Sequence, residues 1–166
     1  MIVLIGFMGA GKTTVGQLLA AQVGLPFVDS DEVIEASERL SVREIFDTRG
    51  EAAFRRLESS TIAGLLAGAD VVLALGGGAL TTAEVREALR GHRVVLLDVA
   101  FEEALERVAA DPGRPMLHRP NLSELYEGRQ GDYRDAAEVV VPVSGFSPRE
   151  VVMDVLSALG QAGVGE

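Results

Sequence analysis

The most constraining feature of the sequence is a glycine-rich segment near the amino terminus, where residues 6–13 read Gly-Phe-Met-Gly-Ala-Gly-Lys-Thr. An apolar run over residues 2–5 precedes it and an amphipathic run over residues 13–23 follows, which predicts a strand, a loop and a helix. The spacing fits the pattern G-x-x-x-x-G-K-[ST], whose backbone N–H groups surround phosphates next to the positive end of a helix. We therefore expect the chain to bind a nucleoside triphosphate, with Lys12 on its β- and γ-phosphates and the Thr13 hydroxyl on Mg²⁺.

Length and composition place the chain among ordinary globular proteins. Its 166 residues predict one domain over residues 1–166, and 48% hydrophobic with 24% charged residues suits a chain that buries a full core. No apolar run approaches the roughly 20 residues of a membrane span, the early first strand leaves no room for a signal peptide, and cysteines are absent. We therefore expect a cytoplasmic protein without a membrane partner, and a monomer by default. The net charge of −10 argues against nucleic acid as a partner, because phosphates require a basic surface.

Five short apolar runs alternate with longer amphipathic stretches along the chain. The runs cover residues 2–5, 27–29, 70–75, 93–99 and 139–143. Strands that are apolar on both faces and alternate with helices form a parallel sheet covered on both sides, which is a three-layer α/β fold. Ligands of such sheets bind at the carboxyl ends of the strands, so the residues that follow each strand are the candidates for a site.

Helices are expected between the strands, and four of them have a capping residue followed three positions later by an acid. These pairs are Ser41 with Glu44, Thr81 with Glu84, Asn121 with Glu124, and Ser147 with Glu150. Three prolines interrupt residues 111–120, and residues 161–166 are expected to be a frayed tail. Prolines, a glycine and two arginines over residues 111–120 are typical of a lid that excludes water, with an ordinary surface connection as the alternative.

Two carboxylates follow the second strand. Asp29 and Asp31 are separated by one residue, so in an extended stretch both side chains lie on the same side. One of them can lie near Mg²⁺, often through water, while the other contacts the hydroxyl group that is phosphorylated. A polar turn that caps the next helix would use the same residues. The neighbouring phosphate-binding loop favours the functional interpretation.

A run of three glycines and a group of arginines are the remaining candidates. Residues 76–78 are all glycine directly after a buried strand, which lets the backbone approach a ligand and offer N–H donors. Arginines near a phosphate site either neutralise the transferred phosphoryl group or form a fork on a substrate carboxylate. The candidates are Arg55, Arg56, Arg114, Arg119, Arg129 and Arg134. Glu58 follows Arg55 by one helical turn and is able to hold its guanidinium.

Together these motifs resemble the shikimate kinase family over nearly the whole chain. Besides the phosphate-binding loop, the matching segments are Asp-x-Asp at residues 29–31, Gly-Glu-x-x-Phe-Arg-x-x-Glu at 50–58, Gly-Gly-Gly at 76–78, Arg-Pro-Met-Leu at 114–117 and Tyr-Arg at 133–134. Their order and spacing agree with the family throughout. One departure is that the family usually has Arg-x-Pro-Leu-Tyr before its second substrate arginine, whereas residues 129–133 read Arg-Gln-Gly-Asp-Tyr.

The resemblance implies both a fold and a reaction. The fold is that of P-loop kinases of the nucleoside-monophosphate-kinase type, with a five-stranded parallel sheet in the order 2-3-1-4-5. A lid would cover about residues 111–120, and a substrate-binding helical part about residues 31–62. The reaction transfers the γ-phosphoryl group of ATP to the 3-hydroxyl of shikimate in aromatic amino-acid biosynthesis. ATP and shikimate would be the small-molecule partners, and Mg²⁺ the cofactor.

The same resemblance implies a role for individual residues. The catalytic residues would be Asp31, Lys12 and Arg114. ATP would be bound by Gly9, Ala10, Gly11, Lys12, Thr13, Thr14, Arg107 and Arg114, with the region of Pro148 also bordering adenine. Shikimate would be bound by Asp31, Arg55, Gly77, Gly78 and Arg134. Mg²⁺ would be held by Thr13 and, through water, by Asp29.

Two alternatives stay open at this point. A kinase for gluconate or a similar sugar acid, on the same fold, would also need a carboxylate clamp, but it gives no reason for the glycine run together with Arg55. A nucleotide-binding module without catalytic activity would keep only the phosphate-binding loop. The presence of Asp31 and Arg114 argues against that module.

Overall fold

The computed structural model describes the backbone of residues 1–110 and 121–162, and the side chains of residues 1–110 and 121–160. Within this part of the chain, five strands form a single sheet in the order β2-β3-β1-β4-β5, and every neighbouring pair is parallel. The strands are β1 (Ile2–Ile5), β2 (Phe27–Asp29), β3 (Val72–Ala74), β4 (Arg93–Asp98) and β5 (Val139–Pro142). Both the three-layer α/β class and the predicted strand order are confirmed.

The centre of the sheet is β1, which pairs with β3 on one side and β4 on the other. Leu4 lies opposite Ala74 in β3 and opposite Val95 in β4. These three side chains are buried, because helices cover both faces of the sheet and leave no solvated side. The parallel pairing brings the carboxyl ends of all five strands to one edge, where the glycine-rich loop after β1 begins.

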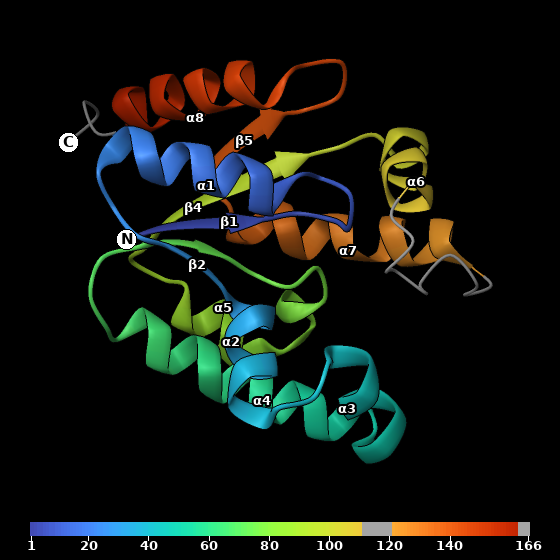
Figure 1. Ribbon diagram of the computed structural model, residues 1–166. Coiled ribbons are helices and arrows are strands. Elements are labelled where there is room, and N and C mark those ends of the chain that lie inside the picture. The colour runs from blue at the N-terminus through green and yellow to red at the C-terminus, as the bar shows by residue number, and fades with distance from the viewer. Residues whose placement is uncertain (111–120, 163–166) are drawn as a thin grey trace.

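Helices surround the sheet on both sides. They are α1 (Lys12–Val23), α2 (Ser30–Glu38), α3 (Val42–Arg49), α4 (Glu51–Leu66), the short 3₁₀ helix η1 (Ala79–Thr81), α5 (Ala83–Ala88), α6 (Phe101–Ala109), α7 (Leu122–Ala136) and α8 (Pro148–Ala162). Figure 1 shows α1 and α8 along one face, and α4, α5 and α7 along the other. Helix α6 lies beyond the carboxyl end of β4, next to the edge that carries the loops (Figure 1).

Two of the four predicted helix caps form as expected. Ser41 and Glu44 exchange hydrogen bonds in a full capping box at α3, and Ser147 and Glu150 do the same before α8. The other two are wrong. Thr81 ends η1 and donates its hydroxyl to the Gly78 carbonyl oxygen at 2.7 Å, so α5 begins only after Thr82.

The fourth predicted cap, at Asn121, fails because of its backbone conformation. Asn121 has φ 75°, in the left-handed region, and its side chain makes no capping hydrogen bond to α7. A residue that caps a helix with its side chain normally has an extended backbone, which turns the side-chain oxygen toward the first turn.

A second, smaller core joins α2, α3 and α4. It consists of Ile34, Ile45 and Phe54, all buried, and is separate from the main core around the sheet. Helices α2 and α3 pack against α4 away from the sheet (Figure 1). This unit carries Asp31 and Arg55, so its packing decides where two of the predicted site residues lie.

Some expectations fall on the ends of the described ranges. The predicted lid at residues 111–120, including Arg114, lies outside the described residues, as does the tail at 163–166. Residues 161–162, expected to be frayed, instead belong to the last turn of α8. Among the described residues, no helix combines the length and the apolar character that crossing a bilayer requires.

Candidate active site

The loop between β1 and α1 folds tightly around the place where phosphates are expected. Gly9 has φ 78°, and a Cβ atom there would lie 2.6 Å from the Ala104 carbonyl oxygen, so no other residue fits without moving α6. Lys12 donates from Nζ to the carbonyl oxygens of Gly6, at 2.7 Å, and Phe7, at 3.1 Å. The ammonium group is therefore held over the loop, within reach of an anion that binds there.

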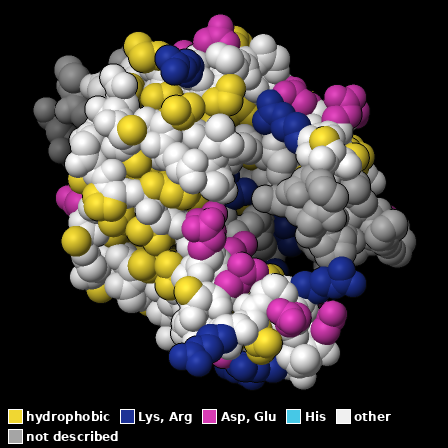
Figure 2. Space-filling model, in the orientation of Figure 1, with side chains coloured by type: hydrophobic (Ala, Val, Ile, Leu, Met, Phe, Trp, Pro, Cys, Tyr) yellow, Lys and Arg dark blue, Asp and Glu magenta, His cyan; other side chains and the backbone are white. Residues whose placement is uncertain are grey.

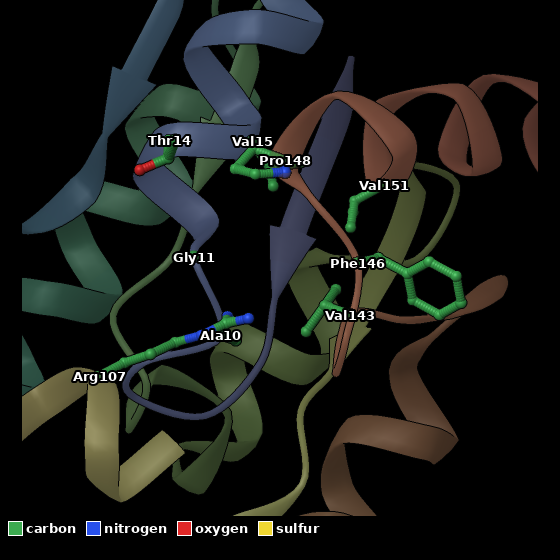
Figure 3. Close-up of a pocket in the computed structure, with 9 residues that line it drawn as sticks. All are labelled: Ala10, Gly11, Thr14, Val15, Arg107, Val143, Phe146, Pro148 and Val151. Atoms are coloured by element: carbon green, nitrogen blue, oxygen red, sulfur yellow. The ribbon is translucent and has the colours of Figure 1, made fainter. Parts of the chain in front are cut away.

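A pocket of about 280 Å³ opens beside this loop (Figure 3). Its lining residues are Ala10, Gly11, Thr14, Val15, Arg107, Val143, Phe146, Pro148 and Val151. Arg107 reaches across from α6 toward Ala10, while Val143, Phe146, Pro148 and Val151 lie on the opposite side (Figure 3). The structure thus brings four of the predicted ATP-binding residues together in one pocket, and the predicted Pro148 region borders it. The apolar lining with one guanidinium suits a nucleobase.

One carboxylate connects the parts of this pocket. Glu103 on α6 pairs with Arg107 and accepts a hydrogen bond from the Gly145 backbone N–H at 3.2 Å. Arg107 in turn donates from Nη1 to the Gly9 carbonyl oxygen at 3.1 Å. Glu103 and Arg107 therefore join α6 to the phosphate-binding loop and to the segment between β5 and α8. Sequence reasoning did not single out Glu103.

Asp29 caps α2 and also contacts the phosphate-binding loop. Its Oδ1 accepts the Asp31 backbone N–H at 2.9 Å and so caps α2. Its Oδ2 accepts a hydrogen bond from the Thr13 hydroxyl at 3.2 Å. The helix cap fixes the carboxylate in an orientation that points its second oxygen at the phosphate-binding loop, which is where the predicted metal ligands belong.

Asp31 lies in a confined and unusually anionic position. Burial raises the pKa of its carboxyl group to about 6, and the neighbouring carboxylates of Asp29 and Glu58 add to this rise. Its Oδ1 is buried and has no hydrogen-bond partner among the described residues. A Cβ atom on Gly76 would lie 2.7 Å from that oxygen, so glycine is needed there for close approach. A buried oxygen without a partner can accept a hydrogen bond from a ligand.

Arg55 is held close to the glycine run. Its Nη1 donates to Glu58 at 2.6 Å, and its guanidinium lies 5.4 Å from the Phe54 ring centre and 5.9 Å from that of Phe46. A Cβ atom on Gly78 would lie 2.8 Å from Nη1 of Arg55. The buried Nε of Arg55 has no hydrogen-bond partner among the described residues. The pairing of Arg55 with Glu58 is as the sequence predicted.

A second guanidinium, that of Arg129 on α7, also lies beside the glycine run. Arg129 is only 8% exposed, and its guanidinium lies 5.9 Å from the centre of the Phe7 ring. A Cβ atom on Gly77 would lie 3.7 Å from its Nη1. The positive charge of Arg129 lowers the pKa of Glu58, as does that of Arg55, but burial outweighs both and the net pKa is raised.

Arg134, the predicted second substrate arginine, is not brought to this cluster. Its side chain is 52% exposed and donates from Nη2 to Asp98 at 2.9 Å. The reason is the phase of α7. Arg129 and Tyr133 are four residues apart and share the inward face of the helix, where both are buried, whereas Arg134 lies one position further around.

The glycine run joins the two groups of residues into one site. A Cβ atom on Gly77 would lie 3.4 Å from the Met8 backbone nitrogen, so Gly77 contacts the phosphate-binding loop on one side and Arg129 on the other. Figure 2 shows this face of the molecule hollowed where Lys and Arg side chains meet Asp and Glu side chains. A phosphate site, a carboxylate of raised pKa and two guanidiniums can together transfer a phosphoryl group to an acidic acceptor.

Comparison with known proteins places this site in a family. A family model described as shikimate kinase matches residues 8–160. A shikimate kinase from Streptomyces coelicolor is 44% identical over 162 residues, covering 96% of this chain and 95% of its own length. The structure of the shikimate kinase from Acinetobacter baumannii in complex with shikimate has a TM-score of 0.92 at 36% identity, covering 99% of this chain and 94% of that one. For the enzyme from Aquifex aeolicus the TM-score is 0.86 at 35% identity, covering 99% of both chains.

Proposed function

This chain belongs to the shikimate kinase family, and from that premise we propose that it transfers the γ-phosphoryl group of ATP to the 3-hydroxyl of shikimate. The products are shikimate 3-phosphate and ADP, so the chain acts in aromatic amino-acid biosynthesis. The observation that carries the proposal is a pair of guanidiniums, the partly buried Arg55 and the buried Arg129, which lie beside residues 77–78 in the same cluster as Glu58 and Asp31. A small molecule with one carboxylate group and several hydroxyl groups fits such a set of donors.

In this proposal Arg55 and Arg129 form the fork for the carboxylate of shikimate, and Arg134 does not. Glu58 fixes Arg55 from behind at 2.6 Å, which leaves the buried Nε of Arg55 to face the ligand. The backbone of Gly77 and Gly78 contacts the hydroxyl groups, because no Cβ atom stands between that backbone and the guanidiniums. Helices within residues 31–62 form the substrate-binding part of a single domain over residues 1–166.

Asp31 acts as the general base in the proposed reaction. A carboxylate with a pKa of about 6 is ionised at neutral pH and more basic than an ordinary aspartate, so it accepts the proton of the 3-hydroxyl as that oxygen attacks. Lys12 neutralises charge on the transferred phosphoryl group after exchanging its carbonyl partners on Gly6 and Phe7 for phosphate oxygens. Arg114, outside the described residues, is assigned to the same phosphates from the proposed lid.

The residues around Thr13 fit a magnesium ion. The Thr13 hydroxyl oxygen and Oδ2 of Asp29 lie 3.2 Å apart at the phosphate-binding loop. Mg²⁺ that binds with a nucleotide is commonly held by one or two protein groups together with phosphates and waters. Among the described residues, no group of three or more His, Cys, Asp and Glu side chains is placed to hold a metal ion, so phosphates and waters would supply the other ligands. A bound Mg²⁺ would neutralise phosphate charge, and Thr13, together with Asp29 through a water, would hold it.

The nucleobase of ATP occupies the pocket of about 280 Å³ between Arg107 and the segment around Phe146 and Pro148. We assign a monomer as the working unit. We place the protein in the cytoplasm, where ATP and the precursors of aromatic amino acids are found.

A coupled assay of ADP release with shikimate, gluconate and no acceptor tests the proposed function. We expect ADP release that depends on shikimate and that saturates, with gluconate giving no more than the rate without acceptor. If turnover depends on gluconate and not on shikimate, the acceptor is a sugar acid and not shikimate. An equal rate in all three mixtures, or none, would contradict acceptor-dependent catalysis and favour the nucleotide-binding module.

A further inference from the structure

Tyr133 is a buried polar group that the proposed reaction does not use. Its side chain lies on α7 one turn after Arg129 and is only 1% exposed. The phenol donates its hydrogen to the Gly77 carbonyl oxygen at 2.5 Å. The phenol also lies close to the Arg129 guanidinium, whose positive charge counteracts the rise in the Tyr133 pKa that burial causes. Tyr133 therefore connects the second guanidinium to the backbone of the glycine run.

The geometry points to Tyr133 as a positioning residue that keeps Arg129 directed at the carboxylate of the acceptor. This inference rests on the proposed function, because it assigns a task to Tyr133 for the same acceptor. Tyr133 acts through the Gly77 carbonyl oxygen, to which it donates its hydroxyl hydrogen next to the Arg129 guanidinium.

The Gly77 carbonyl oxygen and the carboxylate of the acceptor compete for the Arg129 guanidinium. Gly77 lies beside Arg129, with 3.7 Å between the guanidinium and the position of a Cβ atom on Gly77. A buried carbonyl oxygen without a donor is costly and recruits the nearest N–H group. In this site Arg129 is such a group. Without the phenol hydroxyl, the Gly77 carbonyl oxygen would draw Arg129 toward itself and away from an incoming carboxylate.

The phenol suits this task because it has a single proton and a fixed direction. Burial raises the pKa of Tyr133 to about 12, so the hydroxyl stays protonated throughout the working range of the enzyme. The proton points to the Gly77 carbonyl oxygen, and only lone pairs are left for Arg129. The Gly77 carbonyl oxygen therefore does not compete with a ligand for the Arg129 guanidinium.

The chain offers a matched control on the same helix. Tyr126 also donates its hydroxyl to a backbone carbonyl oxygen, that of Val99, at 2.8 Å. Tyr126→Phe and Tyr133→Phe remove the same atom and the same type of hydrogen bond, but only the second hydrogen bond reaches the glycine run.

The experiment measures the Michaelis constants for shikimate and ATP, and the binary affinity for shikimate by calorimetry, in the wild type and both variants. We expect Tyr133→Phe to raise the shikimate KM and dissociation constant about tenfold, as for loss of a hydrogen bond that supports a charged group. The ATP KM should stay within about twofold of the wild type. Tyr126→Phe should leave both constants unchanged.

A neutral acceptor distinguishes a loss of Arg129 positioning from a general disturbance of the acceptor site. The methyl ester of shikimate lacks the anionic group, so its KM should hardly differ between Tyr133→Phe and the wild type, and the preference for the acid should fall about tenfold. An equal rise for acid and ester would mean that Tyr133 has a structural role only. An unchanged shikimate constant would also overturn the inference.

A second variant keeps the test valid if Tyr133→Phe does not fold. Placing 4-aminophenylalanine at position 133 restores a donor to the Gly77 carbonyl oxygen, and the shikimate constant should return to within about threefold of the wild type. Failure to return in a folded protein would contradict the assigned task. Lack of shikimate turnover in the wild type would instead remove the proposed function, so the two failures are distinguishable.

Discussion

The proposed active site has two halves, one for the nucleotide and one for the acceptor, and they are built in opposite ways. The nucleotide half is formed largely by consecutive residues 6–14 of one loop and the start of α1. The acceptor half collects side chains from α2, α4 and α7, which are separated by tens of residues in the sequence. The first uses backbone groups and a loop whose geometry a short pattern specifies, whereas the second depends on how helices pack.

The halves also differ in electrostatics. The nucleobase pocket is largely apolar, with Arg107 at its edge. The acceptor half buries the carboxylate of Glu58 between two guanidiniums and places Asp31 near it. Burying charges is costly unless they are paired, so the acceptor half is expected to trade stability for binding and catalysis. Each half should therefore respond differently to substitution.

The largest expected effect is that of Lys12→Ala in the nucleotide half. If backbone groups alone held the phosphates, the variant would stay active. We expect it to abolish measurable turnover, because no backbone group supplies the positive charge that Lys12 brings to the transferred phosphoryl group. Turnover is measured by ADP release, with far-ultraviolet circular dichroism as the control for folding. Retained activity would remove the phosphate-binding role of this loop.

The next effect is that of Asp31→Asn. The amide keeps the shape but accepts no proton, so kcat should fall about 10²–10⁴-fold while ATP affinity changes little. In the wild type, kcat should fall as pH drops through about 6, where Asp31 becomes protonated, and this limb should be absent from the residual activity of the variant. A loss of ATP affinity with unchanged kcat would place Asp31 with the metal ligands and exchange its role with that of Asp29.

The same variant tests the trade between stability and function. Burial and neighbouring carboxylates raise the pKa of Asp31 from 3.8 to about 6 in the folded state, so folding favours the protonated form. Stability from this group is present below pH 4 and lost as pH rises through 6, and at pH 7 the ionised carboxylate destabilises the fold by up to roughly 3 kcal/mol. Asp31→Asn should therefore melt higher than the wild type at pH 7, with the difference shrinking toward pH 4.

A smaller effect separates the two arginines of α7. Arg129→Lys keeps the charge but loses the fork, so shikimate affinity should weaken about 10- to 100-fold while ATP affinity hardly moves. Arg134→Lys should leave both affinities unchanged, because Arg134 is half exposed and pairs with Asp98. Calorimetry with shikimate and with ATP measures these constants. The reverse pattern would return the second substrate arginine to position 134.

This pair of arginines also shows where sequence reasoning stops. The fold class, the strand order and the phosphate-binding loop could be predicted, since alternation of apolar strands with helices and one local pattern determine them. Which arginine of α7 points into the site could not be predicted from the motif alone. The signal was nevertheless present: Tyr126, Arg129 and Tyr133 recur at helical spacing, which puts Arg129 on the inward face and Arg134 beside it.

Other features were out of reach for a different reason. Ser30 accepts the Gly76 backbone N–H at 3.2 Å and so joins the carboxyl end of β2 to the glycine run. Glu103 joins α6 to Gly145, which is 42 residues away in the sequence. Both contacts arise only after the sheet has brought distant segments to one edge. A pattern of neighbouring residues carries no information about such contacts.

The smallest predicted effect concerns Glu103, the one place where the nucleotide half resembles the acceptor half. Glu103 uses one carboxylate oxygen for Arg107 and the other for the Gly145 N–H. A glutamine has only one acceptor oxygen, and its amide cannot accept the second hydrogen bond. Glu103→Gln therefore releases either the guanidinium or the segment before α8, and the two sides of the nucleobase pocket lose their connection.

We expect Glu103→Gln to raise the ATP KM about threefold and to leave the shikimate constant unchanged, since a partly exposed pair contributes about 1 kcal/mol or less. The matched control is Glu106→Gln, which makes the same change of charge at an exposed position of the same helix. Equal effects of both variants would mean that the net charge of α6, not the bridge, sets ATP affinity. A larger change in the shikimate constant than in the ATP KM would mean that the nucleotide half and the acceptor half are coupled through α6. The two halves would then differ in how they are built but would not respond independently to substitution.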